Sequence, residues 1–98
     1  MIKYFQLQGY HLLQQRWRTP FAEIDLLFSS PLLKRSLLMI EVKKRNSGEF
    51  RNMALSRRQK QRLARVIAWL SESGYLVECQ LVFVGANQEI EIQTEVFG

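Results

Sequence analysis

Two stretches of this sequence decide the fold: FAEIDLLF at residues 21–28 and LMIEVKKR at residues 38–45. Each is rich in apolar residues, as buried strands are. Each also carries charged side chains where a strand of the core should have none, and burying a charge is costly unless a partner compensates it. Carboxylates are the oxygen ligands that hard cations prefer. These two stretches therefore predict paired strands that carry a site, with a metal ion as the expected partner.

Alternation along the two strands predicts which side chains share a face, because successive side chains of a strand point to opposite sides. We expect residues 21–29 to alternate between an apolar face and a face with acids: Ile24, Leu26 and Phe28 against Glu23, Asp25 and Leu27. We expect the same in residues 37–44 and the following arginine: Leu38, Ile40 and Val42 against Met39, Glu41, Lys43 and Arg45. The short link between the strands favours an antiparallel hairpin, which would bring the carboxylates together.

The rest of the chain predicts two helices, three further strands and one long loop. We expect helices over residues 1–8 and 56–74, strands over 10–17, 75–84 and 89–96, and a loop over 46–55. The last strand should lie near an edge of the sheet, because its apolar residues alternate with acids. Long loops in small domains are often functional, so we expect the loop to be mobile or to contact substrate.

The second helix has an unusual charge distribution at its start. Ser56 and Gln59 have the spacing of a capping box, and apolar residues follow at helical spacing. Its first half is nevertheless crowded with bases: Arg57, Arg58, Lys60, Arg62 and Arg65. Bases are unfavourable where the helix dipole is already positive. We interpret the two arginines of the first turn as contacts for phosphate, while a solvated charged face is the alternative.

Composition and charge limit the class of protein. The chain has 98 residues and a net charge of +5, enough for one compact domain over residues 1–98. All fourteen bases and four of the acids lie at or before Arg65, a net charge of +10, and the remainder carries −5. This asymmetry favours a surface for a polyanion. The lone Cys79, the short apolar runs and the missing signal-peptide pattern predict a cytoplasmic protein without a membrane span.

Asp25, Glu41 and Lys43 form the strongest candidate site. Two carboxylates on adjacent strands can bind Mg²⁺, which keeps several waters, and a backbone carbonyl beside Glu41 could add a ligand. Lys43 would share the strand face of Glu41 and could orient the attacking water or neutralise charge on a phosphate. The alternative is a set of exposed ion pairs on a sheet face.

An acid on one strand, Glu-x-Lys on the next and a helix afterwards resembles the PD-(D/E)XK nuclease superfamily. The chain is most similar to the YraN-like family, which is related to archaeal Holliday junction resolvases. The family's Gly-Glu-Ile-Asp-Leu-Ile corresponds to residues 22–27 and its Phe-Val-Glu-Val-Lys-x-Arg to residues 39–45. Its helix pattern corresponds to Lys60, Leu63 and Trp69-Leu70. The resemblance spans nearly the whole chain.

The resemblance implies an α/β fold of the restriction-endonuclease type, in which helices flank a central mixed five-stranded sheet. It also implies a Mg²⁺-dependent site that cleaves phosphodiester bonds, with Asp25 and Glu41 as metal ligands, Lys43 beside them and Glu23 as an accessory acid. Mn²⁺ is a possible substitute for Mg²⁺. Resolvase-like relatives act as dimers, so a homodimer is a further expectation.

The chain departs from the family pattern at three places. Ala22 replaces the glycine, and Glu78-Cys79-Gln80 replaces an Arg-x-Asp pattern. The family also has a glutamate on an upstream helix, which the match of Gly9-Tyr10 would place just before Met1. Either the chain starts late or the protein lacks this acid. We therefore expect a short or truncated N-terminal helix and an incomplete site.

These observations support three hypotheses about function. The first is a Mg²⁺-dependent endonuclease acting on DNA, with branched DNA as a candidate substrate. Its expected nucleic-acid contacts are Arg45, Arg57, Arg58, Lys60, Arg16 and Arg18. The second is a non-catalytic nucleic-acid-binding module, and the third is a protein-interaction domain that uses the last strand or the acidic end. Trp17 could touch nucleic acid, whereas Trp69 is expected in the core and His11 and Cys79 in structural roles.

Overall fold

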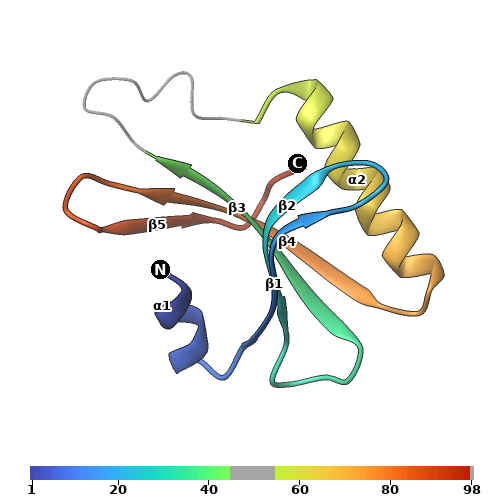
Figure 1. Cartoon of the computed structure of the whole chain (residues 1–98), viewed down its shortest axis with the longest axis horizontal. Coiled ribbons are helices and arrows are strands. Elements are labelled where there is room, and N and C mark those ends of the chain that lie inside the picture. The colour runs from blue at the N-terminus through green and yellow to red at the C-terminus, as the bar shows by residue number, and fades with distance from the viewer. Residues whose placement is uncertain (45–54, 98) are drawn as a thin grey trace.

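Figure 1 shows a computed structural model of the chain, which describes residues 1–44 and 55–97. The elements follow in the order α1 (Ile2–Leu7), β1 (His11–Arg18), β2 (Glu23–Ser29), β3 (Ser36–Lys44), α2 (Arg57–Glu72), β4 (Leu76–Val84) and β5 (Ile90–Gln93). The predicted loop over 46–55 lies outside the described residues except for Leu55, which is buried. No helix in the described ranges is long and apolar enough to span a membrane.

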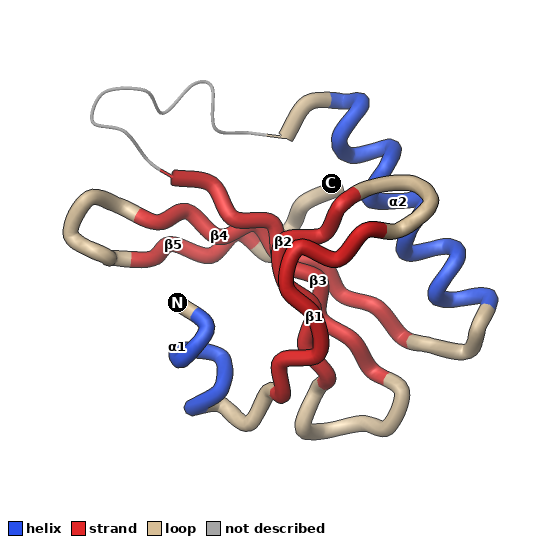
Figure 2. Tube along the Cα trace, in the orientation of Figure 1, coloured by secondary structure: helices blue, strands red, loops and turns tan. Residues whose placement is uncertain are grey.

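The five strands form one mixed sheet in the order β1-β2-β3-β4-β5, which confirms the predicted α/β fold (Figure 2). β1–β2, β2–β3 and β4–β5 pair antiparallel, and β3–β4 pair parallel. The parallel pair follows from α2, because a helical crossover returns the chain to start β4 in the direction of β3. β5 lies at an edge of this sheet, as predicted, because it comes last in the strand order and pairs with β4.

Each face of the sheet is covered by a helix. α2 packs Leu63, Val66 and Leu70 against one apolar cluster, which we call the α2-side cluster. α1 packs Phe5 against the other cluster, the α1-side cluster, where its ring lies 5.3 Å from that of Phe28. Both clusters are apolar throughout, and no polar or charged residue among those described is fully buried. The sheet therefore has two separate cores, and any site must lie where one of them meets solvent.

The start of α2 has the predicted capping box. The Ser56 hydroxyl accepts from the Gln59 backbone N–H at 3.1 Å, and the Gln59 side chain accepts from the Ser56 backbone N–H at 3.0 Å. The first turn contains no acid. The helix ends at Glu72, and Gly74 follows two residues later with a φ of +91°, a left-handed conformation that glycine adopts easily. The capping bonds thus fix where the row of bases begins.

One prediction about β2 is wrong. Ile24 does not share a face with Leu26 and Phe28 but lies in the α2-side cluster. The alternation breaks at Asp25, because the β2–β3 ladder ends at the pair Leu26–Ile40. On the other side of β2, Arg16 falls opposite Asp25 between the paired positions and has a φ of +48°. The backbone is distorted on both sides of the acid.

Two further predictions are wrong in the α2-side layer. The last strand does not reach residue 96 but ends at Gln93, and the chain then turns so that Val96 is buried in the α2-side cluster. Trp69 is not a core residue, because 36% of it is exposed. It is Trp17 that packs against the α2-side cluster, with its ring stacked on that of Trp69.

Candidate active site

Asp25 and Glu41 meet at the point where β2 and β3 separate. The Val42 backbone N–H donates to Asp25 Oδ2 at 2.8 Å, and the Asp25 backbone N–H donates to Glu41 Oε1 at 3.4 Å. Each carboxylate thus bonds to the backbone of the opposite strand. These bonds replace ladder pairing beyond Leu26–Ile40 and satisfy backbone groups that would otherwise lose their partners. The predicted pairing of the two carboxylates is therefore present in the structure.

The environment of Glu41 opposes its ionisation. Burial raises the pKa of Glu41 from 4.5 to about 7, and the nearby charge of Asp25 adds to this rise. The backbone hydrogen bond from Asp25 and the charge of Lys43 lower the pKa, and the charge of Glu23 raises it slightly. Two carboxylates that share a site repel each other unless a cation or a proton compensates them. The site thus favours a bound positive charge.

Lys43 and Glu23 also lie at the predicted positions. Lys43 is half-buried on β3, two residues beyond Glu41, and its charge acts on that carboxyl group. Glu23 is exposed at the start of β2 and pairs with Arg18 at 3.7 Å. The pair is open to solvent, so its contribution to stability is small. Glu23 thus lines the pocket from an exposed position, whereas Lys43 acts on Glu41 through its charge.

A pocket of about 220 Å³ opens beside the carboxylates. Its lining joins β2, β3 and α2: Ala22, Glu23, Glu41, Gln59, Arg62 and Leu63. Sequence reasoning did not assign Gln59 or Arg62 to the site. The signal that would have found them is helical spacing. Gln59 lies four residues before the buried Leu63, and the exposed Arg62 lies three residues after Gln59 and four before the buried Val66. Arg62 brings a positive charge to the pocket that holds Glu41.

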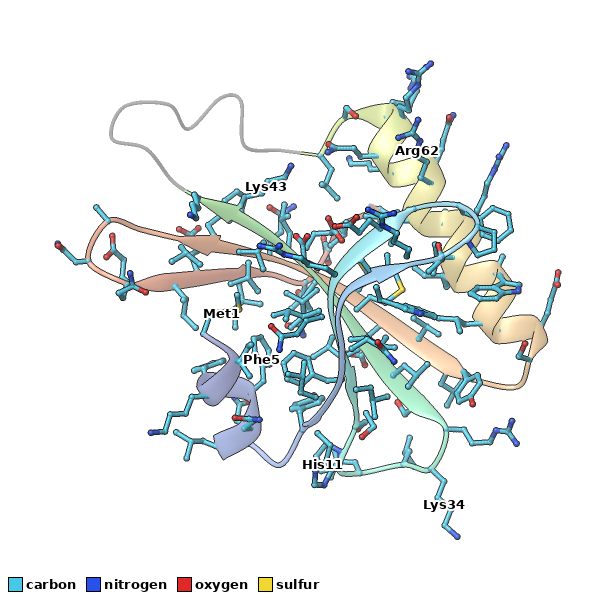
Figure 3. The ribbon with its side chains drawn as sticks, viewed as in Figure 1. Met1, Phe5, His11, Lys34, Lys43 and Arg62 are labelled. Carbon is cyan, nitrogen blue, oxygen red and sulfur yellow. The ribbon has the colours of Figure 1, made fainter. Side chains whose placement is uncertain are left out.

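Five of the six predicted nucleic-acid contacts lie on α2 and β1. Arg57 and Arg58 are exposed on the first turn of α2, and Lys60 is half-buried beside them. Arg16 and Arg18 are exposed on β1, the strand paired with β2. Arg45 lies outside the described residues. In Figure 3, Lys43 near the end of β3 and Arg62 on α2 lie in the upper part of the view, and His11 and Lys34 lie at the opposite end.

The donor set fits a hard divalent cation. Mg²⁺ is usually held by one or two carboxylates, with waters and substrate phosphates completing its octahedral coordination. Asp25 and Glu41 supply two such carboxylates, and each uses one oxygen for a backbone N–H. Within residues 1–44 and 55–97, no three side chains of His, Cys, Asp or Glu are grouped to hold a metal ion. This part of the chain thus suits Mg²⁺ or Mn²⁺ better than metals that need three or four protein ligands.

Cys79 does not take part in this chemistry. It is buried in the α2-side cluster, and burial raises the pKa of its thiol to about 12, with a further contribution from the charge of Glu41. A thiol that stays protonated is a poor nucleophile and a poor metal ligand. The prediction of a small buried side chain is confirmed.

Comparison with known proteins agrees with this fold. Residues 1–86 match the family described as "Uncharacterised protein family UPF0102". A UPF0102 protein of Nitrobacter winogradskyi is 37% identical over 68 residues, which cover 68% of this chain and 55% of the relative. A UPF0102 protein of Parvibaculum lavamentivorans is 40% identical over 65 residues, covering 66% and 47%. One of Rhodopseudomonas palustris is 39% identical over 69 residues, covering 68% and 50%.

A mixed sheet with a crossover helix and carboxylates at the separation of two strands defines the restriction-endonuclease-like class of α/β fold. The chain belongs to the UPF0102 family, which is the YraN-like group of PD-(D/E)XK nuclease-like proteins. The chain spans about half the length of the curated relatives it matches.

Proposed function

We propose that this chain carries a Mg²⁺-dependent endonuclease site that hydrolyses DNA phosphodiester bonds. The observation that supports it best is the reciprocal bonding of Asp25 and Glu41 to the backbone where β2 and β3 separate. This bonding fixes the two carboxylates relative to each other, and Glu41 lines an open pocket. The raised pKa of Glu41 supports a site that favours a cation. A pair of exposed surface acids would show neither the bonds nor the pKa shift.

The residues of the chain have separate roles in this proposal. Asp25 and Glu41 hold the cation, which when bound polarises the phosphate and lowers the pKa of a coordinated water. Lys43 orients the attacking water or stabilises the negative charge that develops on the phosphate. Arg62 binds a phosphate oxygen at the α2 wall of the pocket. Arg57, Arg58 and Lys60 hold the neighbouring phosphates of the strand.

DNA is the proposed substrate because nine of the bases lie on β1, β3 and the first half of α2, whereas most of the acids lie at the other end of the sequence. The part of the chain up to Arg65 carries a net charge of +10, and it supplies β1, β2, β3 and the first half of α2. Branched DNA is the substrate that the likeness to resolvases suggests. We propose DNA cleavage with branched DNA as one member of the test set.

A non-catalytic DNA-binding module is the second candidate. It is favoured by one observation: the part of the chain that the structure describes offers two close carboxylates and no third ligand from His, Cys, Asp or Glu. On this alternative the acids are dispensable for binding. The basic residues of α2 alone would then determine the affinity and its salt dependence.

The experiment is a cleavage assay on linear, flapped and four-way DNA with Mg²⁺, Mn²⁺ or EDTA. The parent is expected to cut at least one substrate when a cation is present, and Glu41→Ala is expected to cut about 10²–10³-fold more slowly. Glu78→Ala is the matched control, because Glu78 is an exposed acid on β4 outside the pocket. Cutting by Glu41→Ala at the parent rate would contradict the proposal. Salt-sensitive binding without cutting by the parent would establish the second candidate instead.

A further inference from the structure

Three aromatic side chains gather beside the active site, at the turn between β1 and β2. The rings of Trp17 and Trp69 are stacked, with centroids 6.0 Å apart and an interplanar angle of 25°. The ring of Phe21 meets Trp69 edge-on at 6.1 Å and 68°. Trp17 and Phe21 come from the β1–β2 hairpin and Trp69 from α2. We call these three residues the aromatic cluster.

The aromatic cluster is rigid on its inner side and open on its outer side. Trp17 packs against the α2-side cluster and supports Trp69 from behind. Thr19 fixes the turn that carries Phe21, since its hydroxyl donates to the Ala22 carbonyl at 2.6 Å and accepts from the Ala22 N–H at 3.0 Å. Trp69 is 36% exposed and Phe21 is 37% exposed. Two large rings are thus held in place with part of their surface in water.

A hollow of about 330 Å³ lies at the aromatic cluster. It is lined by Phe21, Arg65, Ala68, Trp69 and Glu72. The linings of this hollow and of the pocket that holds Glu41 are adjacent in the chain. Phe21 lines the hollow, and the next two residues, Ala22 and Glu23, line the pocket. On α2, Arg62, Arg65 and Trp69 follow one another at spacings of three and four residues, so they lie along one stripe of the helix.

Arg62 and Trp69 are seven residues apart, which corresponds to about 10 Å along α2. That length is about three steps of a strand in duplex DNA at ~3.4 Å per nucleotide, and fewer steps of a more extended unpaired strand. A strand that passes the carboxylate pair and follows α2 would reach Trp69 within three nucleotides. Arg65 lies between the two positions and can hold a phosphate, whereas Glu72 at the far end would repel one.

We propose that the exposed face of Trp69, with Phe21 as its side wall, stacks an unpaired base of the bound DNA strand. This inference rests on the proposed nuclease function and specifies its substrate: DNA with an unpaired nucleotide within three positions of the cleaved phosphate. The base stacks on the outer face, since a base between Trp17 and Trp69 would need about two stacking distances, or ~7 Å. A base inside a duplex is already stacked on both sides and gains nothing from Trp69.

The first test uses the parent protein and no variant. DNA duplexes with a short single-stranded flap carry 2-aminopurine at one flap position each, and binding is measured in EDTA so that no cleavage occurs. Stacking on an indole quenches 2-aminopurine, so its fluorescence should fall at one or two flap positions near the junction. The same probe inside a fully paired duplex should not change. An unchanged signal at every flap position would overturn the stacking site.

The second test compares variants by their affinity for flapped and for fully paired DNA. Trp69→Ala should bind flapped DNA about five- to one-hundredfold more weakly, the usual range for loss of one stacked base, and paired DNA within twofold of the parent. Trp69→Phe should retain most of the preference and shows that the fold is intact. Leu76→Ala is the control, because Leu76 is 63% exposed at the start of β4 and does not line the hollow at the aromatic cluster.

The outcomes separate this inference from the nuclease proposal. Equal losses on flapped and paired DNA for Trp69→Ala would overturn the stacking site, while cleavage that depends on Glu41 would still support the nuclease. A parent that binds neither DNA at low salt would overturn both. A preference for flapped DNA that disappears in Trp69→Ala and persists in Trp69→Phe would support the inference.

Discussion

At the scale of the residue, Glu41 is a carboxyl group whose ionisation opposes folding. Its folded pKa of about 7 exceeds the ordinary 4.5, mainly through burial and then through Asp25. A group whose pKa is raised in the folded state contributes stability that is fully present below pH 4.5 and is lost as the pH rises through 7. The protein therefore retains an ionisable group at a cost in stability, which is typical of a functional site.

Replacing this carboxyl group by a neutral amide should stabilise the metal-free protein at high pH. We expect Glu41→Gln to raise the free energy of unfolding at pH 8 by about 1 kcal/mol, a value reduced for the half-exposed position of the side chain. This corresponds to about 4–8 °C in Tm for a domain of this size. Near pH 4 the two proteins should unfold at similar temperatures. Thermal unfolding followed by circular dichroism in EDTA measures both.

Divalent cation provides the control for that experiment. Mg²⁺ or Mn²⁺ at pH 8 should raise the Tm of the parent, because ligands that bind only the folded state stabilise it. Glu41→Gln should show a smaller rise. A parent that is less stable at pH 5 than at pH 8 in EDTA would contradict the pKa of Glu41 and the sign of its effect.

The predicted acids and Lys43 are found together because strand alternation and a short hairpin are sufficient to place them. The same alternation failed for Ile24, since the backbone is distorted at Asp25 and Arg16. That distortion is what lets the carboxylates bond to the opposite backbone. The sequence rule therefore failed at the functional residue itself, where a regular strand is not the structure that the chemistry needs.

At the scale of the element, α2 connects the site to the sheet through its N-terminal cap. The reciprocal bonds between Ser56 and Gln59 fix the first turn, which carries Arg57 and Arg58 without any acid to compensate the dipole. The same Gln59 lines the pocket beside Glu41. Loss of the cap should therefore affect both the stability of the helix and the position of its bases.

Ser56→Ala should lower the free energy of unfolding by about 1 kcal/mol, because the hydroxyl that accepts from the Gln59 N–H is lost. Urea unfolding measures the change. Ser71→Ala is the matched control, since Ser71 is exposed within the same helix and alanine there should be neutral or slightly stabilising. Equal effects of the two substitutions would show that the cap contributes nothing specific.

In β5 and α2, the local sequence pattern did not predict the structure correctly. Acids alternate with apolar residues from 89 to 92, which predicts a strand. The strand ends at Gln93, because the chain then turns and buries Val96 in the α2-side cluster. Tryptophan is often found in protein cores, but Trp69 is partly exposed on α2. Its neighbours Val66 and Leu70 are buried. Tertiary contacts with Trp17 and Phe21, which no local pattern reveals, decide its position.

At the scale of the whole molecule, charge separates along the chain and around the sheet. Bases lie on β1, at the end of β3 and along the first half of α2, and the residues after Arg65 carry a net charge of −5. A bound polyanion would thus be oriented as well as attracted. The mixed sheet could be predicted from the order of the elements. The relation of the aromatic cluster to the pocket could not, because it depends on how the β1–β2 turn packs on α2.

The bases of the first turn of α2 should determine the salt dependence of DNA binding. Replacing Arg57 and Arg58 together by glutamine should reduce the slope of log K against log salt by up to about 2, since each phosphate contact contributes roughly 0.9. Fluorescence anisotropy at several salt concentrations measures the slope. Replacing Lys3 and Lys34 together removes the same charge elsewhere and should leave the slope nearly unchanged. Lys3 is exposed on α1, which packs on the other face of the sheet, and Lys34 lies at the opposite end of the molecule from Arg62 (Figure 3). A smaller slope in both double variants would contradict a localised surface.

The most direct test of the central claim, a phosphodiester-cleaving site of Asp25, Glu41 and Lys43, is the single-turnover rate of DNA cleavage in Mg²⁺ for Lys43→Ala and Lys44→Ala. The two lysines are adjacent on β3, but Lys43 is half-buried beside Glu41 and Lys44 is exposed. The account predicts a loss of about 10²–10³-fold for Lys43→Ala and a rate within about twofold of the parent for Lys44→Ala. Equal rates for the two variants, or no cleavage by the parent, would contradict it.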